Sequence, residues 1–189
     1  MNNIHRITHI ALLTALSLIL FVLEGFLPLP LPVPGAKLGL AAIVTLIALC
    51  ILPMRDAALM LALRILLASA LGGGLAPLLY SLAGGAASFA AMVLLKQHSQ
   101  LSIVGISAAG GFLHNMAQLL VAAAVMQTSA LFSYAPVLGF VGILTGIGIG
   151  IAVAAVILGA YRAAVGETGV LLEQAFSYTY LSLATFGLV

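Results

Sequence analysis

The chain has 189 residues, of which 64% are hydrophobic and only 5% charged, with a formal net charge of +2. Six Lys or Arg and four Asp or Glu are too few for the water-facing surface of a soluble domain, in which about a quarter of the residues are charged. The composition therefore excludes a soluble protein, and the small net charge gives no reason to expect a nucleic-acid partner. We expect an all-α integral membrane protein whose exterior contacts membrane lipid.

Charges, prolines and glycines divide the chain into six apolar segments, each near the ~20 residues that a helix needs to cross a bilayer. Four alternating prolines in 28–34 predict an extended connector after the first segment. The polar turn 53–56, the glycine triplet 72–74 and the polar stretch 127–136 separate later segments. The first two predicted spans are residues 9–26 and 38–52, and the third runs from the turn at 53–56 to residue 71. The other three are residues 76–95, 101–126 and 137–161.

The basic residues predict the orientation of this six-helix bundle. With a cytoplasmic N-terminus, four of them fall on the cytoplasmic side: Arg6, Arg55, Lys96 and Arg162. Lys37 alone falls outside, near Glu24. Because basic residues concentrate on the cytoplasmic side, we expect a multi-pass protein of the cell membrane with both termini in the cytoplasm.

The chain is predicted to form one transmembrane domain, residues 1–162, followed by a tail, residues 163–189. The last 16 residues are uncharged and rich in aromatic side chains, but short for a span. We expect the tail to be an interfacial or loosely ordered segment, with a seventh crossing as the alternative.

Arg64 is the first candidate site residue, because a charged side chain inside a span is costly. It lies nine residues beyond Arg55, about 13 Å along a helix at ~1.5 Å per residue, near the bilayer midplane. It either binds an anionic or polar ligand, or is satisfied by backbone carbonyls or a helix partner.

The fifth predicted span carries a polar seam. His114 and Gln118 are four residues apart and share a helix face, with Asn115 beside them and Gly111 and Ser107 extending the stripe. The seam predicts a ligand or ion site at nearly the depth of Arg64, so that both can face one cavity. The alternative is simple hydrogen bonding between helices.

Three further residues lie toward the outer side. Glu24 and Lys37 flank the proline connector, where they form either an ion pair that pins the loop or the rim of a binding site. Tyr80, near the outer end of the fourth span, contributes a hydroxyl to the site or anchors the interface.

Small residues recur at helical spacing, as in Gly84 with Ser88 and in the row Gly142, Gly146 and Gly150. Such rows let helices approach closely, so we expect them to pack the bundle.

The sequence lacks the motifs of several catalytic classes. It has no phosphate-binding Gly-x-x-x-x-Gly-Lys-Ser/Thr loop, no Asp-rich pair for magnesium diphosphate chemistry, no His-Glu-x-x-His and no cysteine cluster. Asp56 stands beside Arg55 in a predicted loop and offers no acid–base pair. We expect no catalytic residue, no bound metal, no cofactor and no enzymatic activity of the chain alone.

Two segments resemble a known family. The proline-rich stretch that ends in Gly-Ala-Lys-Leu-Gly-Leu at 35–40, and the later His114-Asn115-x-x-Gln118, are similar to the Gx transporter family. That family is also labelled heptaprenyl diphosphate synthase component I and resembles the substrate-binding (S) components of energy-coupling factor (ECF) transporters. The resemblance covers about residues 5–162.

The resemblance implies a six-helix S-component fold that binds a small polar molecule, such as a vitamin or precursor, toward the outer side. It also implies docking of the first helix, through Ala11 and Ala15, onto an ECF coupling subunit driven by two ATPases. The expected function is therefore substrate capture for uptake, with Arg64, His114, Asn115, Gln118, Glu24, Lys37 and Tyr80 as substrate-binding residues. The alternatives are an accessory membrane protein of prenyl or quinone metabolism that binds an isoprenoid intermediate, and a stand-alone secondary carrier with His114 as a proton relay.

Overall fold

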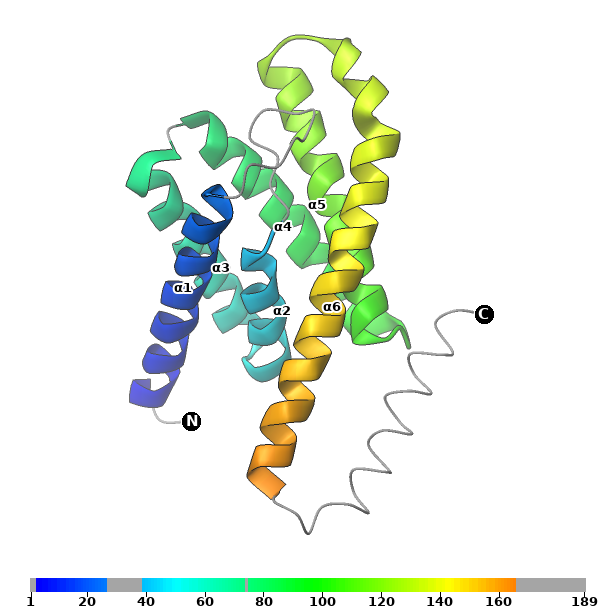
Figure 1. Ribbon diagram of the computed structural model, residues 1–189. Helices are drawn as coiled ribbons and strands as arrows, with labels where there is room; N and C mark the ends of the chain where they lie inside the picture. Colours follow the sequence, from blue (N-terminus) through cyan, green and yellow to red (C-terminus); the bar gives the residue numbers. More distant parts are fainter. Residues whose placement is uncertain (1–2, 27–38, 74, 166–189) are drawn as a thin grey trace.

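The computed structural model describes residues 3–26, 39–73 and 75–165, and over these residues the protein is helical throughout (Figure 1). The elements are α1 (Asn3–Gly25), α2 (Ala41–Ile51), α3 (Met54–Ala68), the π-helical turn η1 (Ser69–Gly73), α4 (Leu75–His98), α5 (Ile103–Val125), the 3₁₀ turn η2 (Ser129–Tyr134) and α6 (Ala135–Val165). The all-α prediction is confirmed for this part of the chain. The proline connector and the tail beyond residue 165, with the residues predicted there, lie outside the described residues, and the first three residues of the predicted tail continue α6.

Four of the described helical segments are long and apolar enough to cross a membrane: Ile4–Gly25, Leu78–His98, Ile103–Val125 and Ser129–Ala163. The α2 helix, with 11 residues, and α3, with 15 residues, are about 17 and 23 Å long at ~1.5 Å per residue. Both are shorter than the ~30 Å hydrocarbon core of a bilayer. The structure thus supports a membrane protein with four long apolar helices, and six full crossings remain a prediction.

Helices α4, α5 and α6 pack along much of their length because glycines at their contacts carry no side chain. A Cβ built on Gly142 of α6 would lie 2.6 Å from the carbonyl oxygen of Gly111 of α5. One built on Gly150 would lie 2.6 Å from the Cα of Val104. The glycine row of α6 therefore brings the α5 and α6 backbones into direct contact, as the sequence predicted, and the two helices run side by side in Figure 1.

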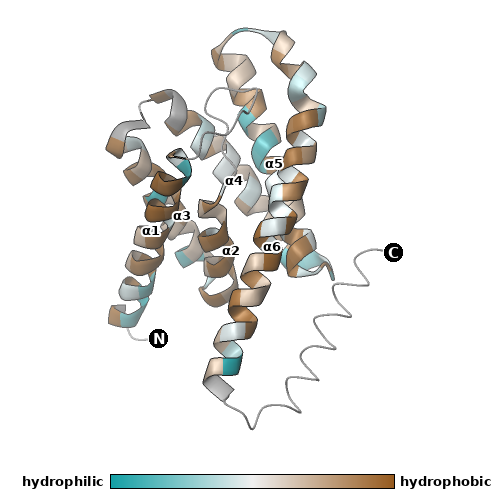
Figure 2. Ribbon diagram, in the orientation of Figure 1, coloured by the Kyte–Doolittle hydropathy of each residue, from teal (hydrophilic) through white to brown (hydrophobic). Residues whose placement is uncertain are grey.

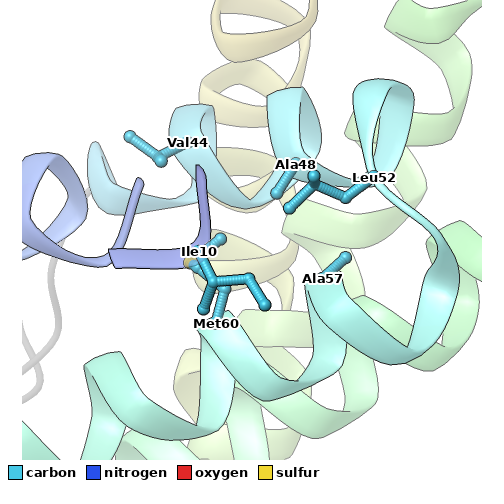
Figure 3. Packing of buried hydrophobic residues seen from close by; sticks show 6 residues of the cluster. All are labelled: Ile10, Val44, Ala48, Leu52, Ala57 and Met60. Atoms are coloured by element: carbon cyan, nitrogen blue, oxygen red, sulfur yellow. The ribbon is translucent and has the colours of Figure 1, made fainter. Parts of the chain in front are cut away.

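Helices α1, α2 and α3 share an apolar cluster of their own. Figure 3 shows Ile10 of α1 and Met60 of α3 facing the side chains of α2. The buried members of this cluster are Ile10, Val44, Ala48, Leu52, Ala57 and Met60. Together they hold the two short helices against α1.

The polar groups at one end of the molecule join the helices there. Arg6 of α1 forms a two-point ion pair with Asp56 of α3, with Nε donating to Oδ2 at 2.7 Å and Nη2 donating to Oδ1. Lys96 Nζ of α4 donates to the carbonyl oxygen of Leu49 of α2 at 2.5 Å. Figure 2 shows hydrophilic residues near the start of α1 and the end of α6, which lie at this same end. The grouping fits the predicted clustering of basic residues on one side, and the cytoplasmic identity of that side remains a prediction.

The Arg6–Asp56 pair corrects the expectation for Asp56. The sequence placed this residue in a loop beside Arg55, whereas the structure places it in the first turn of α3 with 1% of its surface exposed. A carboxylate in the first turn interacts favourably with the helix dipole, and a buried carboxylate needs a cationic partner. Arg6, distant in sequence, supplies that partner.

Candidate functional site

Arg64 lies on the inward face of α3, and only 8% of its surface is exposed. Its Nε atom is buried and has no hydrogen-bond partner among the described residues. Burying a guanidinium N–H without an acceptor is unfavourable, and nearly all buried polar groups in folded proteins find partners. Within the described part of the chain, the structure therefore contains one buried, charged donor without an acceptor.

Two consecutive glycines of α4 lie between Arg64 and the polar residues of α5. A Cβ built on Gly85 would lie 2.9 Å from Cδ1 of Ile65 and 3.9 Å from Nη2 of Arg64. One built on Gly84 would lie 2.9 Å from Cε1 of His114 and 2.9 Å from Cγ of Gln118. The absence of side chains at Gly84 and Gly85 thus lets α3 and α5 bring Arg64 and His114 close to the same turn of α4.

Electrostatic interactions join these groups to α1. His114 lies within electrostatic range of Arg64, and Glu24 of α1 also lies within electrostatic range of Arg64. Arg64, His114, Gln118 and Glu24 are hereafter called the central cluster. The structure brings these four predicted site residues into one region from three helices.

Glu24 has a structural role within this cluster. It is 3% exposed, and its carboxylate accepts hydrogen bonds from the backbone N–H groups of Gly39 at 2.6 Å and Leu40 at 3.0 Å. These amides directly precede α2, so Glu24 satisfies N–H groups at the helix start, where a negative charge is stabilised. Lys37 lies outside the described residues, and its predicted pairing with Glu24 remains a prediction.

Asn115 faces a different helix from His114. Its Nδ2 donates to the carbonyl oxygen of Leu138 in α6 at 2.9 Å, and Asn115 is 8% exposed. Gly111 and Ser107 also lie against α6, next to Gly142 and Gly146. The single stripe expected from the sequence is therefore wrong: Asn115, Gly111 and Ser107 form part of the α5–α6 interface, whereas His114 and Gln118 face α4.

Tyr80 lies in an apolar environment. It packs against a cluster made by α5, η2 and α6, whose buried members are Leu119, Ala122, Ala123, Leu131 and Leu138. The ring of Tyr80 thus helps to hold the η2 end of the bundle, and a role of its hydroxyl in ligand binding remains a prediction.

Ala11 and Ala15 lie on the outward face of α1. Both are exposed, together with large apolar neighbours such as Leu12 and Ile19, which are 64% and 56% exposed. The opposite face of α1, with Ile10, Thr14 and Ser17, is buried in the bundle. The two alanines are accessible to lipid or to a partner, and the predicted partner interface remains a prediction.

Sequence reasoning missed the role of the glycine pair. It treated Gly84 as a packing residue and did not single out Gly85. The available signal was two adjacent glycines in the middle of an apolar segment, at a depth comparable with Arg64 and His114. Among the residues that the structure describes, no group of three or more His, Cys, Asp or Glu is placed to hold a metal ion.

Replacing Gly84 with alanine is expected to displace His114 and Gln118 with little loss of helix, because the new Cβ meets side-chain atoms at 2.9 Å. Overpacking of this kind costs about 1–3 kcal/mol, partly offset by the higher helix propensity of alanine. Nuclear magnetic resonance of the imidazole in detergent should show a changed environment for His114. Gly159→Ala, where nothing lies within 4 Å, is the matched control and should leave that signal unchanged. An unchanged His114 signal in Gly84→Ala would show that the ring does not pack against α4.

The chain was compared with models of protein families. The family model described as heptaprenyl diphosphate synthase component I matches residues 13–156, from the middle of α1 through most of α6. Neither the curated proteins nor the solved structures contain a match to the chain. The family label agrees with the resemblance drawn from the proline-rich segment and the His114 motif.

Proposed function

This chain belongs to the family described as heptaprenyl diphosphate synthase component I, and we propose that it is the substrate-binding membrane component of an ECF-like uptake transporter. Its substrate in this proposal is a small polar molecule such as a vitamin or precursor. The chain spans the cell membrane six times with both termini in the cytoplasm. It captures the substrate from outside and depends on partner ATPases for energy.

The observation that carries the proposal is the buried Nε of Arg64, which has no hydrogen-bond partner in the part of the chain that the structure describes. Charged residues inside membrane segments are costly, face the bundle interior and are characteristic of substrate sites. Here the charge of Arg64 on α3 lies near Gly85 of α4, within electrostatic range of His114 on α5 and of Glu24 on α1. A site between helices, lined by polar groups and small residues, suits the binding of a small molecule within the membrane.

The proposed partners are a membrane coupling subunit and two ATPases. The exposed face of α1 around Ala11 and Ala15 supports this part, because small residues permit close helix approach. In this proposal the chain binds and hands over its substrate without catalysing a reaction, and it needs no metal or cofactor of its own.

The family description favours a second candidate function. A component of a prenyl diphosphate synthase would bind an isoprenoid intermediate and assemble with a catalytic subunit. In that case Arg64 would hold the polar head of a lipid whose chain lies among the apolar helices. The two candidates differ in the ligand and in the partner that remain bound to the purified protein.

The test is to purify the full chain in detergent from its native membrane and to identify retained ligands and partners by mass spectrometry. A small polar molecule, together with a coupling subunit and ATPases, is expected. The Arg64→Gln variant should bind the ligand at least about tenfold more weakly and retain correspondingly less of it. The reason is that losing a hydrogen bond to a charged group costs about 1.5–3 kcal/mol of binding free energy. Arg55→Gln removes the same charge from an exposed position of the same helix and should retain the ligand.

Other outcomes would reject the transporter proposal. A bound isoprenoid with a synthase subunit supports the second candidate instead. Ion-driven uptake by the isolated chain in vesicles supports a secondary carrier. Equal ligand retention by wild type and Arg64→Gln would remove Arg64 from the site.

A further inference from the structure

The central cluster combines one cation with one carboxylate, and their arrangement restricts the charge of a ligand. Among the described residues, no atom accepts a hydrogen bond from the buried Nε of Arg64. Glu24 lies within electrostatic range but directs its two carboxylate oxygens to the amides of Gly39 and Leu40. Glu24 therefore compensates the charge of the guanidinium at a distance, while the Nε donor is left for a different acceptor.

We propose that Arg64 binds the carboxylate group of a small carboxylic-acid substrate. This inference rests on the proposed function, because it names the substrate class of the same site. The argument has three parts: the shape of the guanidinium, the net charge around it, and the polar groups of α5.

The shape of the donor favours a planar acceptor. The Nε–H and one Nη–H of a guanidinium are parallel, and together they match the two oxygens of a carboxylate. Arg64 Nε is buried and has no hydrogen-bond partner among the described residues, and its Nη2 lies 3.9 Å from the position of a Cβ built on Gly85. Cδ1 of Ile65 lies 2.9 Å from that same position, so the planar acceptor meets the guanidinium along its Nε edge and not against Gly85.

The charge balance favours a single negative charge. Glu24 is a fixed, buried carboxylate near the same guanidinium, so it repels any added anion in this region of low dielectric. A diphosphate carries several negative charges and in proteins is held by several cations or by magnesium. A carboxylate adds one charge, which a single guanidinium can compensate.

Gln118 supplies the second donor, and His114 lies beside it. The ring of His114 lies against Gly84, one residue from the glycine that faces Arg64, and it is within electrostatic range of the guanidinium. The single N–H of an uncharged imidazole is used here in a hydrogen bond to the backbone of Gly84, so the other ring nitrogen can accept, and the amide of Gln118 can donate or accept. These two groups can recognise the part of the substrate next to its carboxylate.

The experiment measures the thermal unfolding midpoint of the purified full chain in detergent, with acetate, inorganic phosphate or inorganic diphosphate replacing chloride at constant ionic strength. Acetate should raise the Tm by about 2–4 °C when it is well above its dissociation constant. Diphosphate should give a smaller rise than acetate. Arg64→Gln should lose the acetate response, whereas Arg55→Gln, with the same change of charge on the same helix, should keep it.

Arg64→Lys covers the case in which Arg64→Gln does not fold. It keeps the positive charge but not the parallel pair of donors, so its acetate response should be clearly reduced. A larger response to diphosphate or phosphate than to acetate would overturn the carboxylate assignment. No response to any oxyanion, or equal responses in wild type and both Arg64 variants, would overturn the binding site itself.

The inference and the proposed function fail separately. An Arg64-dependent acetate response without a coupling subunit or a retained transport substrate would support the site and reject the transporter. Retention of an uncharged substrate together with the transporter partners would support the proposed function and reject the carboxylate.

Discussion

Replacing Gly142 with alanine is expected to lower the free energy of unfolding by about 3 kcal/mol, the upper part of the range for overpacked cores. The new Cβ would lie 2.6 Å from the carbonyl oxygen of Gly111 and 2.9 Å from its carbonyl carbon. Both are backbone atoms, which cannot rotate away as a side chain can. Helices α5 and α6 would have to separate, and their contacts at Gly146 and Gly150 would loosen as well.

The matched control for this variant is Gly148→Ala on the same helix. Nothing lies within 4 Å of a Cβ at Gly148, so the alanine should be neutral or stabilise the helix by up to about 1 kcal/mol. Reversible unfolding in mixed detergent micelles, followed by circular dichroism, measures both variants. Equal stabilities for Gly142→Ala and Gly148→Ala would show that α5 and α6 are not in backbone contact.

The helical segments were largely predictable from the sequence, because charges, prolines and glycines interrupt an otherwise apolar chain. The boundaries were less predictable. The α1 helix begins at Asn3, six residues before the predicted span, because a helix can continue beyond the apolar segment. The α2 helix begins at Ala41, directly after the two residues whose N–H groups donate to Glu24, and it is therefore short. That boundary depends on the hydrogen bonds that Gly39 and Leu40 donate to Glu24, which lies 15 and 16 positions earlier in the chain. Local sequence patterns do not reveal such contacts.

The depth of the candidate site was predictable, but the direction of its side chains was not. A rise of ~1.5 Å per residue sufficed to place Arg64 and His114 at similar depth. Which neighbour each residue faces depends on how the helices are arranged around α5. Since α5 lies between α4 and α6, a rotation of 100° per residue separates His114, which faces α4, from Asn115, which bonds to α6.

Replacing Glu24 with alanine is expected to be the most damaging change in the central cluster, with a loss of about 3–5 kcal/mol in the free energy of unfolding. The substitution leaves the amides of Gly39 and Leu40 without their acceptor and leaves the buried charge of Arg64 uncompensated. Glu24→Gln retains one acceptor oxygen but no charge, so its loss should be smaller, about 1–3 kcal/mol. Unfolding in mixed micelles measures both variants under the same conditions.

The double variant Glu24→Gln/Arg64→Gln separates the two contributions. If the charges of Glu24 and Arg64 stabilise each other, removing both should cost less than the sum of the two single changes, by about 0.5–3 kcal/mol. Strictly additive losses would show that Glu24 acts on the start of α2 alone. A coupling between Glu24 and Arg64 would mean that a ligand carboxylate bound to Arg64 competes with Glu24 for the same positive charge. Ligand binding would then weaken the attachment of α1 to the start of α2.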